Sequence, residues 1–567
     1  MATKKTKTST SVKPPKYPQG LPRRASEMNA AQRYASLEGH RWPYWQRARE
    51  AAHLTIPYIM PPIGTTEATE LDTPYQSVAA RGVNNLAAKL LLALFPPGQS
   101  FFRLTMDDFV KDKLAKELPP DPDGADPRTV FEEALGKVEN AVINRLEQAG
   151  SRSTFYEALR HLIVAGNVLL EEYEKGKYKL YHLPSYVVQR DPQGSPIDIV
   201  IKQCLSRAAL PDEIEAVISE TEQAEDVEQT DKSADRTIDV FTRCRLVGKQ
   251  WEIYQEVAGK RIPGTEATEP KDECSFMPLR WNRLDGENYG RGLVEEHLGD
   301  IRFVESGSQS IIDFAAAIAR ILIFVDEGGV TQKKNVGKAR NGSVVDGKAS
   351  DVSVLQLEKS ADFQVLESVM ERVEKRLEAS FLMYAGAQRD AERVTAEEVR
   401  LVASELEQAL GGMYSLLANE MQLPIVRRTM AVMQKEKALP FLPKDAVAPK
   451  IITGLAAIGR SSDLDKIQQL LKVIGDAFTP AVAAQYFSVS ETIRRAATAL
   501  GIDLDKMAKS DVQVQQATAQ QNTQSMAEKL GPSVIGAMSD QAKAAQQNGQ
   551  APVQGAQPQQ AQPAPQR

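Results

Sequence analysis

The side chains that could do chemistry are spread along this sequence and are not gathered into motifs. Three carboxylates, Asp121, Asp123 and Asp126, stand close enough together to suggest calcium binding. The loop that holds them lacks an EF-hand pattern, and Pro122 and Pro127 interrupt it, so a plain linker is the better interpretation. The three cysteines and five histidines are widely spaced and show no metal-ligand spacing. We therefore predict no metal site.

The signatures of common catalytic sites are also missing. The sequence contains no G-x-x-x-x-G-K-[ST] phosphate loop, no G-x-S-x-G nucleophile elbow, no H-E-x-x-H zinc motif and no dinucleotide fingerprint after a strand. Carboxylates are plentiful, but a single sequence does not pair them as acid and base. We predict a protein that is not an enzyme, with no catalytic residue and no cofactor.

One polar segment, 386–394, carries charges that could contact phosphate groups. Arg389 and Arg393 stand there beside Asp390 and Glu392. A wholly basic surface would hold nucleic acid by counterion release, whereas mixed charge leaves a weak attraction that is independent of sequence. The alternative is that the two arginines pair with the neighbouring acids or cap the ends of helices.

Composition places the chain among globular proteins. It has 567 residues, of which 42% are hydrophobic and 25% charged, enough for roughly two to four domains. A net charge of −6 argues against tight, static binding of nucleic acid. The longest apolar run, 311–325, is too short to span a bilayer, and no secretory signal is evident, so we expect no membrane contact.

Local patterns predict the elements of the N-terminal half. A helix is expected to be interrupted near Pro43, and the proline-rich stretch 55–62 cannot be helical. A second helix should open with Thr73 as its N-cap and Pro74 at its first position. Further along, the pattern indicates helices over about 129–171, strands over 177–205 and 237–284, and an acidic exposed segment over 211–236.

The next part reads as a long helix, a small insert and a second helix. The first helix, 291–322, has a middle crowded with small residues, among them Gly307 and Ala316. Small residues let helices approach closely, either within one chain or between neighbouring subunits. The insert, 323–365, combines short strands with Gly-rich turns. A helix capped by Thr395 follows the second helix, with an expected kink at Gly411.

Three stretches, in this order, resemble the head-to-tail connector, or portal, family of short-tailed, podovirus-type bacteriophages. They are LDTPYQSVAARGVNNLAAKLLLALFPPGQSFFRL (71–104), ENYGRGLVEEHLGDIRFVESGSQSII (287–312) and RDAERVTAEEVRLVASELEQALGGMYS (389–415). The resemblance covers about 30–510.

The resemblance implies a mainly α fold with α/β portions, the phage portal fold of wing, stem, clip and helical crown, assembled into a ring that is usually a dodecamer. On this pattern the chain divides into a flexible basic arm (1–27), a wing region of helices and β strands (28–290), a stem helix (291–322), a clip (323–365), a second stem helix (366–385), a tunnel loop (386–394), a long kinked wing helix (395–442), a helical crown (443–511) and a disordered Gln/Ala/Pro-rich tail (512–567).

The same resemblance implies a role in the virion, at one vertex of the capsid, with assembly in the host cytoplasm. The ring would form the channel for genome packaging and ejection. The implied partners are further copies of this chain, terminase, tail adaptor proteins, major capsid and scaffolding proteins, and double-stranded DNA in transit. Arg389 and Arg393 would face the DNA channel, and Gly307 and Ala316 would pack subunits together.

Two alternatives stay open on the sequence. One is another oligomeric virion component, such as an internal or tail-adaptor protein, which a purified ring with a central channel would exclude. The other is an unrecognised hydrolase acting on nucleic acid, which metal-dependent nuclease activity would support.

Overall fold

The computed structural model describes residues 27–62, 64–65, 68–98, 100–106, 127–207, 214, 218, 237–318, 323–340, 342–354, 360–383, 402, 405–406, 408–440, 447–451 and 472. The chain divides into two compact units, one of Met1–Val110 with Ala134–Gly459 and the other of Lys111–Glu133 with Arg460–Arg567. Nearly all described residues belong to the first unit, so the fold below is that of the first unit.

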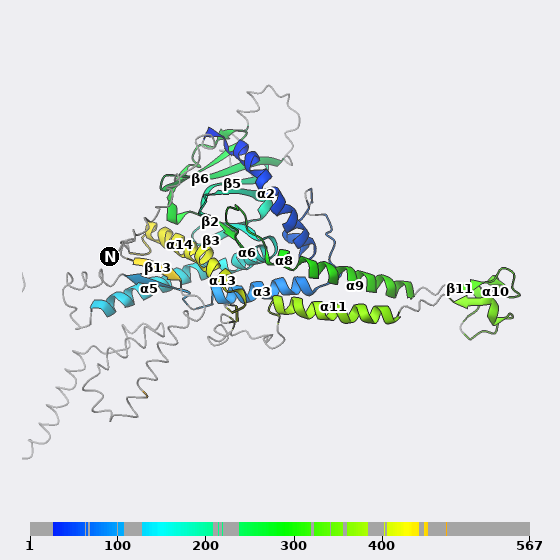
Figure 1. Ribbon diagram of the computed structural model, residues 1–567. Coiled ribbons are helices and arrows are strands. Elements are labelled where there is room, and N and C mark those ends of the chain that lie inside the picture. The colour runs from blue at the N-terminus through cyan, green and yellow to red at the C-terminus, as the bar shows by residue number, and fades with distance from the viewer. Residues whose placement is uncertain are drawn as a thin grey trace, which may run out of the picture. The chain divides into compact units, whose positions relative to one another are not determined.

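Helices and strands alternate along the described chain (Figure 1). The helices are α2 (Ala30–His53), α3 (Val78–Leu94), α5 (Pro127–Gln148), α6 (Ser151–Ala165), α8 (Leu293–Glu296), α9 (Leu298–Ile318), α10 (Lys333–Lys338), α11 (Ser360–Ser380), α13 (Gly412–Leu417), the π-helix η6 (Ala418–Gln422) and α14 (Leu423–Lys435), with 3-10 turns η1 (Pro57–Ile59), η2 (Leu183–Ser185), η4 (Lys271–Glu273) and η5 (Ala349–Asp351). The strands are β1 (Phe102–Met106), β2 (Asn167–Glu174), β3 (Lys177–Tyr181), β4 (Tyr186–Arg190), β5 (Pro196–Ser206), β6 (Thr237–Val247), β7 (Gln250–Val257), β8 (Lys260–Arg261), β9 (Ala267–Pro270), β10 (Phe276–Arg280), β11 (Ile323–Val325), β12 (Val352–Val354) and β13 (Val447–Ile451).

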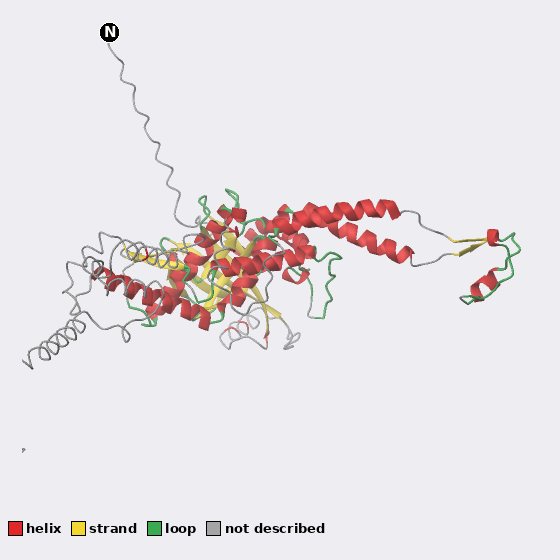
Figure 2. Ribbon diagram, turned by 90° about the horizontal axis from the view of Figure 1, so that it is seen from below, coloured by secondary structure: helices red, strands yellow, loops and turns green. Residues whose placement is uncertain are grey.

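Two antiparallel sheets form the centre of the first unit, where Figure 2 shows strands gathered among helices. The six-stranded sheet has the order β4-β5-β6-β7-β8, with β9 also paired to β7, and the three-stranded sheet has the order β10-β2-β3. The expected strand–turn–strand at 177–205 is confirmed. Its turn depends on Asp191, whose carboxylate accepts from the backbone of Gln193 and Ser195, and on Gly194 with φ +88°.

A buried ionic network attaches α2 to the six-stranded sheet, beside which it lies in Figure 1. Arg33 Nε donates to Asp198 Oδ2 at 2.7 Å, and Arg243 NH2 donates to the same oxygen at 3.0 Å. Glu256 Oε2 accepts from the backbone N–H of Ala30 at the first turn. Because burial of an unpaired charge is costly, these mutual partners hold the helix in one position on the sheet.

The main apolar core lies between α3, α6 and the neighbouring strands. The apolar stripe of α3 faces this core, since Val83, Leu86 and Leu90 are fully buried. At the end of α3, Phe95 stacks on Phe155 of α6 with ring centroids 4.6 Å apart. These contacts make α3 the central helix of the first unit.

Three details of the N-terminal half differ from the prediction. The helices predicted to run to about 171 end at Ala165, because Gly166 adopts a left-handed conformation with φ +72°, and strand β2 begins at Asn167. The helix α2 continues through Pro43, because the buried residues Arg33 and Trp45 hold it to the body on both sides of the proline. The next helix begins at Val78 instead of near Thr73. The side chain of Gln76 accounts for this later start, since its Oε1 accepts from the N–H of Ala79 at 3.0 Å.

The C-terminal part of the described chain also corrects the prediction. The interruption at Gly411 is confirmed by its φ of +49°, and after it the helix continues past Pro424, because α14 follows directly from the π-helix. Short helices were expected from residue 443, whereas 447–451 form a strand that pairs with β1, Phe102 opposite Ile451. The two terminal segments, 1–26 and 512–567, and most of 452–511 lie outside the described residues.

The described chain is thus a mixture of helices and strands, as predicted in outline. Within this part of the chain, no helix is both long enough and apolar enough to cross a bilayer.

Candidate subunit-contact and DNA-contact site

Two of the candidate site residues, Gly307 and Ala316, lie on helix α9, which runs side by side with α11 in both views (Figures 1 and 2). The pair is antiparallel, because Arg376, near the end of α11, binds Asp300, near the start of α9. The structure breaks the predicted helix 291–322 at His297, giving α8 and then α9. The second helix begins at Ser360, earlier than predicted, and ends at Ser380.

Gly307 is buried at the contact between the two helices. A Cβ atom at this position would lie 2.5 Å from Met370 Sδ of α11, closer than such atoms approach. The glycine therefore packs against its own chain, which is the intrachain possibility that the sequence left open. Ala316, nine residues further along α9, is exposed in the single chain.

Side chains near the start of α9 fix its direction. Glu305 accepts hydrogen bonds from the backbone N–H groups of Tyr75 and Gln76 through its two carboxylate oxygens, at 3.0 and 3.2 Å. Arg302 forms an ion pair with Glu50 of α2. Sequence reasoning missed Glu305, because its partners lie about 230 positions earlier in the chain and no local pattern points to them.

The C-terminal end of α11 is capped by side chains of α3. Asn85 Nδ2 donates to the carbonyl oxygens of Phe381 and Leu382, each at 3.1 Å, and Lys89 Nζ donates to that of Leu382 at 2.8 Å. A cation suits this helix end, where carbonyls lack partners within the helix. A Cβ on Gly82 would lie 2.6 Å from the ring of Phe381, so only a glycine lets α11 approach α3 this closely.

Sequence reasoning also missed this capping group, although a signal for it exists. Positions 82, 85 and 89 fall on one face of a helix, and all three lie within the stretch 71–104 that carries the resemblance. When one face of an apolar helix carries a glycine, an amide and a cation, it indicates a close contact with the C-terminal end of another helix.

Lys89 also links the two sides of the segment that holds the candidate arginines. Its ammonium contacts Leu382 O at 2.8 Å before that segment and Glu405 Oε2 at 3.1 Å after it. Residues 384–400 themselves, and with them Arg389 and Arg393, lie outside the described residues. The described residues on both sides of the segment are therefore attached to α3 through Lys89.

The insert between α9 and α11 is a small unit with its own polar centre. β11 and β12 pair antiparallel, Ile323 opposite Val354. Between them, Thr331 donates its backbone N–H and its hydroxyl to Asp351 Oδ2, both at 3.1 Å. The short helix α10 presents exposed lysines, including Lys334, to solvent.

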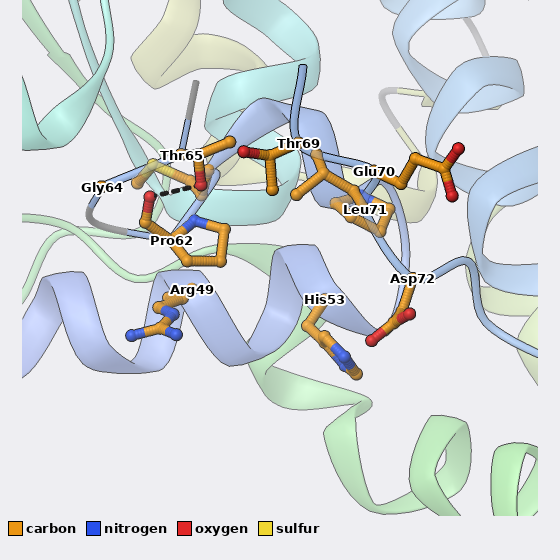
Figure 3. Close-up of a pocket in the computed structure, with 11 residues that line it drawn as sticks. Arg49, His53, Pro62, Gly64, Thr65, Thr69, Glu70, Leu71 and Asp72 are labelled. Atoms are coloured by element: carbon orange, nitrogen blue, oxygen red, sulfur yellow. Dashed lines mark hydrogen bonds between the residues drawn. The ribbon is translucent and has the colours of Figure 1, made fainter. Parts of the chain in front are cut away.

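A pocket of ≈ 290 Å³ lies between α2 and the segment that follows η1 (Figure 3). Arg49 and His53 of α2 line one side, and Pro62 and Thr65 line the other, where the Thr65 hydroxyl donates to Pro62 O at 2.7 Å. Because Arg49 and His53 are themselves exposed, water and salt screen their charges.

Metal-ligating side chains do not cluster in the part of the chain that the structure describes, where no group of three or more His, Cys, Asp or Glu residues could hold an ion.

Comparison with known proteins identifies the family. The family model for the bacteriophage head to tail connecting protein matches residues 27–507. The portal protein of Escherichia phage T7 is 41% identical over 506 residues, which cover 88% of this chain and 91% of that protein. The portal protein of Enterobacteria phage T3 is 40% identical over 495 residues, covering 86% and 90%.

A solved structure gives a more distant likeness. A chain in the neck of an empty gene transfer agent (GTA) particle aligns with 75% of this chain and 90% of its own length, at 13% identity and a TM-score of 0.34. The sequence matches are much stronger and extend over nearly the whole described chain. The chain belongs to the family of bacteriophage head-to-tail connecting proteins, the family that the stretches 71–104, 287–312 and 389–415 indicated.

Proposed function

We propose that this protein is the portal of a tailed bacteriophage, the channel through which the genome enters and leaves the capsid. The observation that carries the proposal is the match to portal proteins, 41% identical to that of phage T7 over most of both chains. The chain is a structural component on this proposal, and ATP hydrolysis belongs to the packaging motor.

The subunits would form a closed ring, a dodecamer on the family's pattern, at one capsid vertex. Rings form when one face of a subunit binds a different face of the next and the rotation closes. The exposed face of α9, which includes Ala316, is a suitable contact for a neighbouring stem. In this assignment α9 and α11 are the stem, the insert between them is the clip, 28–290 and 395–442 form the wing, and 443–511 form the crown.

Segment 386–394 would be the tunnel loop, with Arg389 and Arg393 touching passing DNA weakly. Support comes from the described residues that flank it, since Lys89 of α3 binds Leu382 before the segment and Glu405 after it. The mixed charge of the segment suits transit, since a ring of wholly basic loops would neutralise many phosphates and retain the duplex. The contact would be independent of base sequence.

The remaining partners follow from the same proposal. Terminase would dock on the ring during packaging and the tail adaptor proteins afterwards, while major capsid and scaffolding proteins would surround it during assembly in the host cytoplasm. The exposed lysines of α10 place positive charge on the insert, which fits a docking surface for acidic partners.

The test combines ring assembly with packaging. Purified wild-type protein should show end-on rings with a central channel in electron micrographs. The double variant Arg389→Glu/Arg393→Glu should form the same rings but package less DNA. The matched control is Lys260→Glu/Arg261→Glu, which makes the same charge change on the exposed strand β8 and should package normally.

Each alternative outcome has a clear meaning. Normal genome yield with correctly assembled Arg389→Glu/Arg393→Glu rings would contradict the DNA contact. A stable monomer at all concentrations would contradict the ring. Metal-dependent nuclease activity of the purified protein would favour the hydrolase alternative.

A further inference from the structure

We propose that Cys244 and Cys274 are a redox-active dithiol that closes to a disulfide within the folded subunit. Their sulfur atoms lie 3.7 Å apart, and both cysteines are in the thiol form in this structure. The proposal goes beyond the portal function and depends on residues that play no part in the proposed channel.

Cys244 belongs to the six-stranded sheet, whereas Cys274 lies in the segment that leads into the three-stranded sheet. Cys244 lies in the middle of β6, opposite Ile199 of β5 and Ile253 of β7, and is only 1% exposed. Cys274 follows η4 and leads into β10 of the three-stranded sheet, and it is partly exposed. A bond between them would join the six-stranded sheet to the three-stranded sheet at their boundary.

The geometry requires only a small movement. A disulfide bond is about 2.05 Å long, so the two sulfur atoms must approach by less than 2 Å. The backbone N–H of Phe276 donates to Cys274 Sγ at 3.4 Å and orients that thiol beside its partner. The third cysteine, Cys204 of β5, is exposed and donates to Asp239 Oδ1 at 3.1 Å, so it takes no part in the proposed pair.

The reaction needs a disulfide oxidant, for which oxidised glutathione is the probe. The accessible Cys274 thiolate attacks one glutathione sulfur, forms a mixed disulfide and releases one reduced glutathione. The Cys244 thiolate then attacks Cys274 Sγ, forms the protein disulfide and releases the second glutathione. Two protein thiols are oxidised, one glutathione disulfide is reduced, and the two protons lost by the protein thiols are taken up by the two glutathione thiolates that leave.

Cys244 should control the rate of the second step. Burial above all, and then the hydrogen bond and charge interaction with Cys274, raise the pKa of the Cys244 thiol. Because the thiolate is the nucleophile, ring closure should speed up as the pH rises above neutrality. The mixed disulfide on Cys274 should therefore be visible briefly at neutral pH and resolve faster at alkaline pH.

The cross-link would lie beside the attachment of α14. Arg428 of α14 binds Glu269 at 2.7 Å and Glu273 O at 3.0 Å, and both glutamates lie in the loop of about 30 residues that the disulfide would close. Closing this loop restricts the unfolded chain and raises the melting temperature. Thiols persist in a reducing cytoplasm and oxidise outside it, so on the proposed function the bond would form after release of the particle.

The experiment uses the full-length protein carrying Cys204→Ser, so that only the proposed pair remains. Native protein is incubated with oxidised glutathione or with dithiothreitol and analysed by intact mass, thiol alkylation and peptide mapping. We expect loss of both reactive thiols, a mass lower by two hydrogens, a 244–274 cross-linked peptide, and a melting temperature several degrees higher. Adding Cys244→Ala should stop the reaction at a glutathione adduct on Cys274.

Three results would overturn the proposal. The first is that both thiols still react with the alkylating reagent after prolonged oxidation of native protein at alkaline pH. The second is that the glutathione adduct on Cys274 accumulates without forming the protein disulfide while Cys244 is present. The third is that the cross-link forms only after the protein has been unfolded in denaturant. Since Cys204 is an exposed residue, its replacement should leave the fold intact, and a melting transition equal to that of wild type verifies this.

Discussion

Replacing Gly82 by alanine tests the close contact between α3 and α11. Glycine to alanine inside a helix normally stabilises it by about 0.8–1 kcal/mol. At Gly82 the new methyl group would lie 2.6, 2.8 and 2.9 Å from Cγ, Cδ2 and Cβ of Phe381. Phe381 is fully buried, and its Cβ is attached to the backbone and cannot swing away. Overpacking of this kind costs about 1–3 kcal/mol, so after the helix gain is subtracted we expect a net loss of up to about 2 kcal/mol.

Gly39→Ala is the matched control, because Gly39 also lies within a helix, α2, but a Cβ there would meet no atom within 4 Å. That variant should gain about 0.5–1 kcal/mol. In urea titrations each kcal/mol moves the unfolding midpoint by a few tenths of a molar or more, so the two variants should shift in opposite directions. The loss caused by Gly82→Ala should shrink in a Phe381→Leu background. Equal stabilisation by both alanines would refute the reasoning.

The remaining predictions concern acid stability, assembly and the C-terminal tail. Burial, followed by the nearby His182 and Arg160, lowers the pKa of His161 to about 3, so stability is lost as the pH falls from about 6.5 towards 3. His161→Asn should reduce this loss by up to a few kcal/mol, and an unchanged pH profile of the urea midpoint would count against it. Ala316→Trp, at an exposed position of α9, should block ring assembly in light scattering while leaving the subunit's melting temperature within a degree or so. Truncation after residue 511 should leave melting and ring size nearly unchanged, because the Gln/Ala/Pro-rich tail has too few large apolar residues to form a core; a large drop would show that it docks on the body.

Periodic patterns were enough to predict the elements whose burial repeats regularly. The stripe of α3 and the strands β6 and β7 follow directly from the spacing of their apolar residues. Element ends were predicted less well. The start of α3 depends on the Gln76 side chain, whose Nε2 also donates to Leu54 O at 2.7 Å, and this is a tertiary contact that a local capping rule does not contain.

The candidate site residues were likewise predictable from the sequence only in part. Gly307 was recognised because small residues mark close helix contacts, but its partner Met370 lies beyond the insert and no local pattern identifies it. Strand β13 was missed because Pro449 lies within it and proline disfavours strands. Pro449 lies opposite Leu104 of β1, and this pairing depends on tertiary structure that brings together segments far apart in the sequence.

The pairing of β1 with β13 has a consequence for synthesis of the chain. Phe102 and Ile451 are opposite each other, so β1 leaves the ribosome long before its partner strand exists. At roughly 5–20 residues per second, about 20–70 seconds pass between the emergence of the two strands. During that interval the described residues give β1 no other strand to pair with, and its exposed edge is open to pairing with other nascent chains. Slow translation between residues 106 and 447 should therefore raise aggregation, and a chaperone that covers exposed strands should have its largest effect in this window.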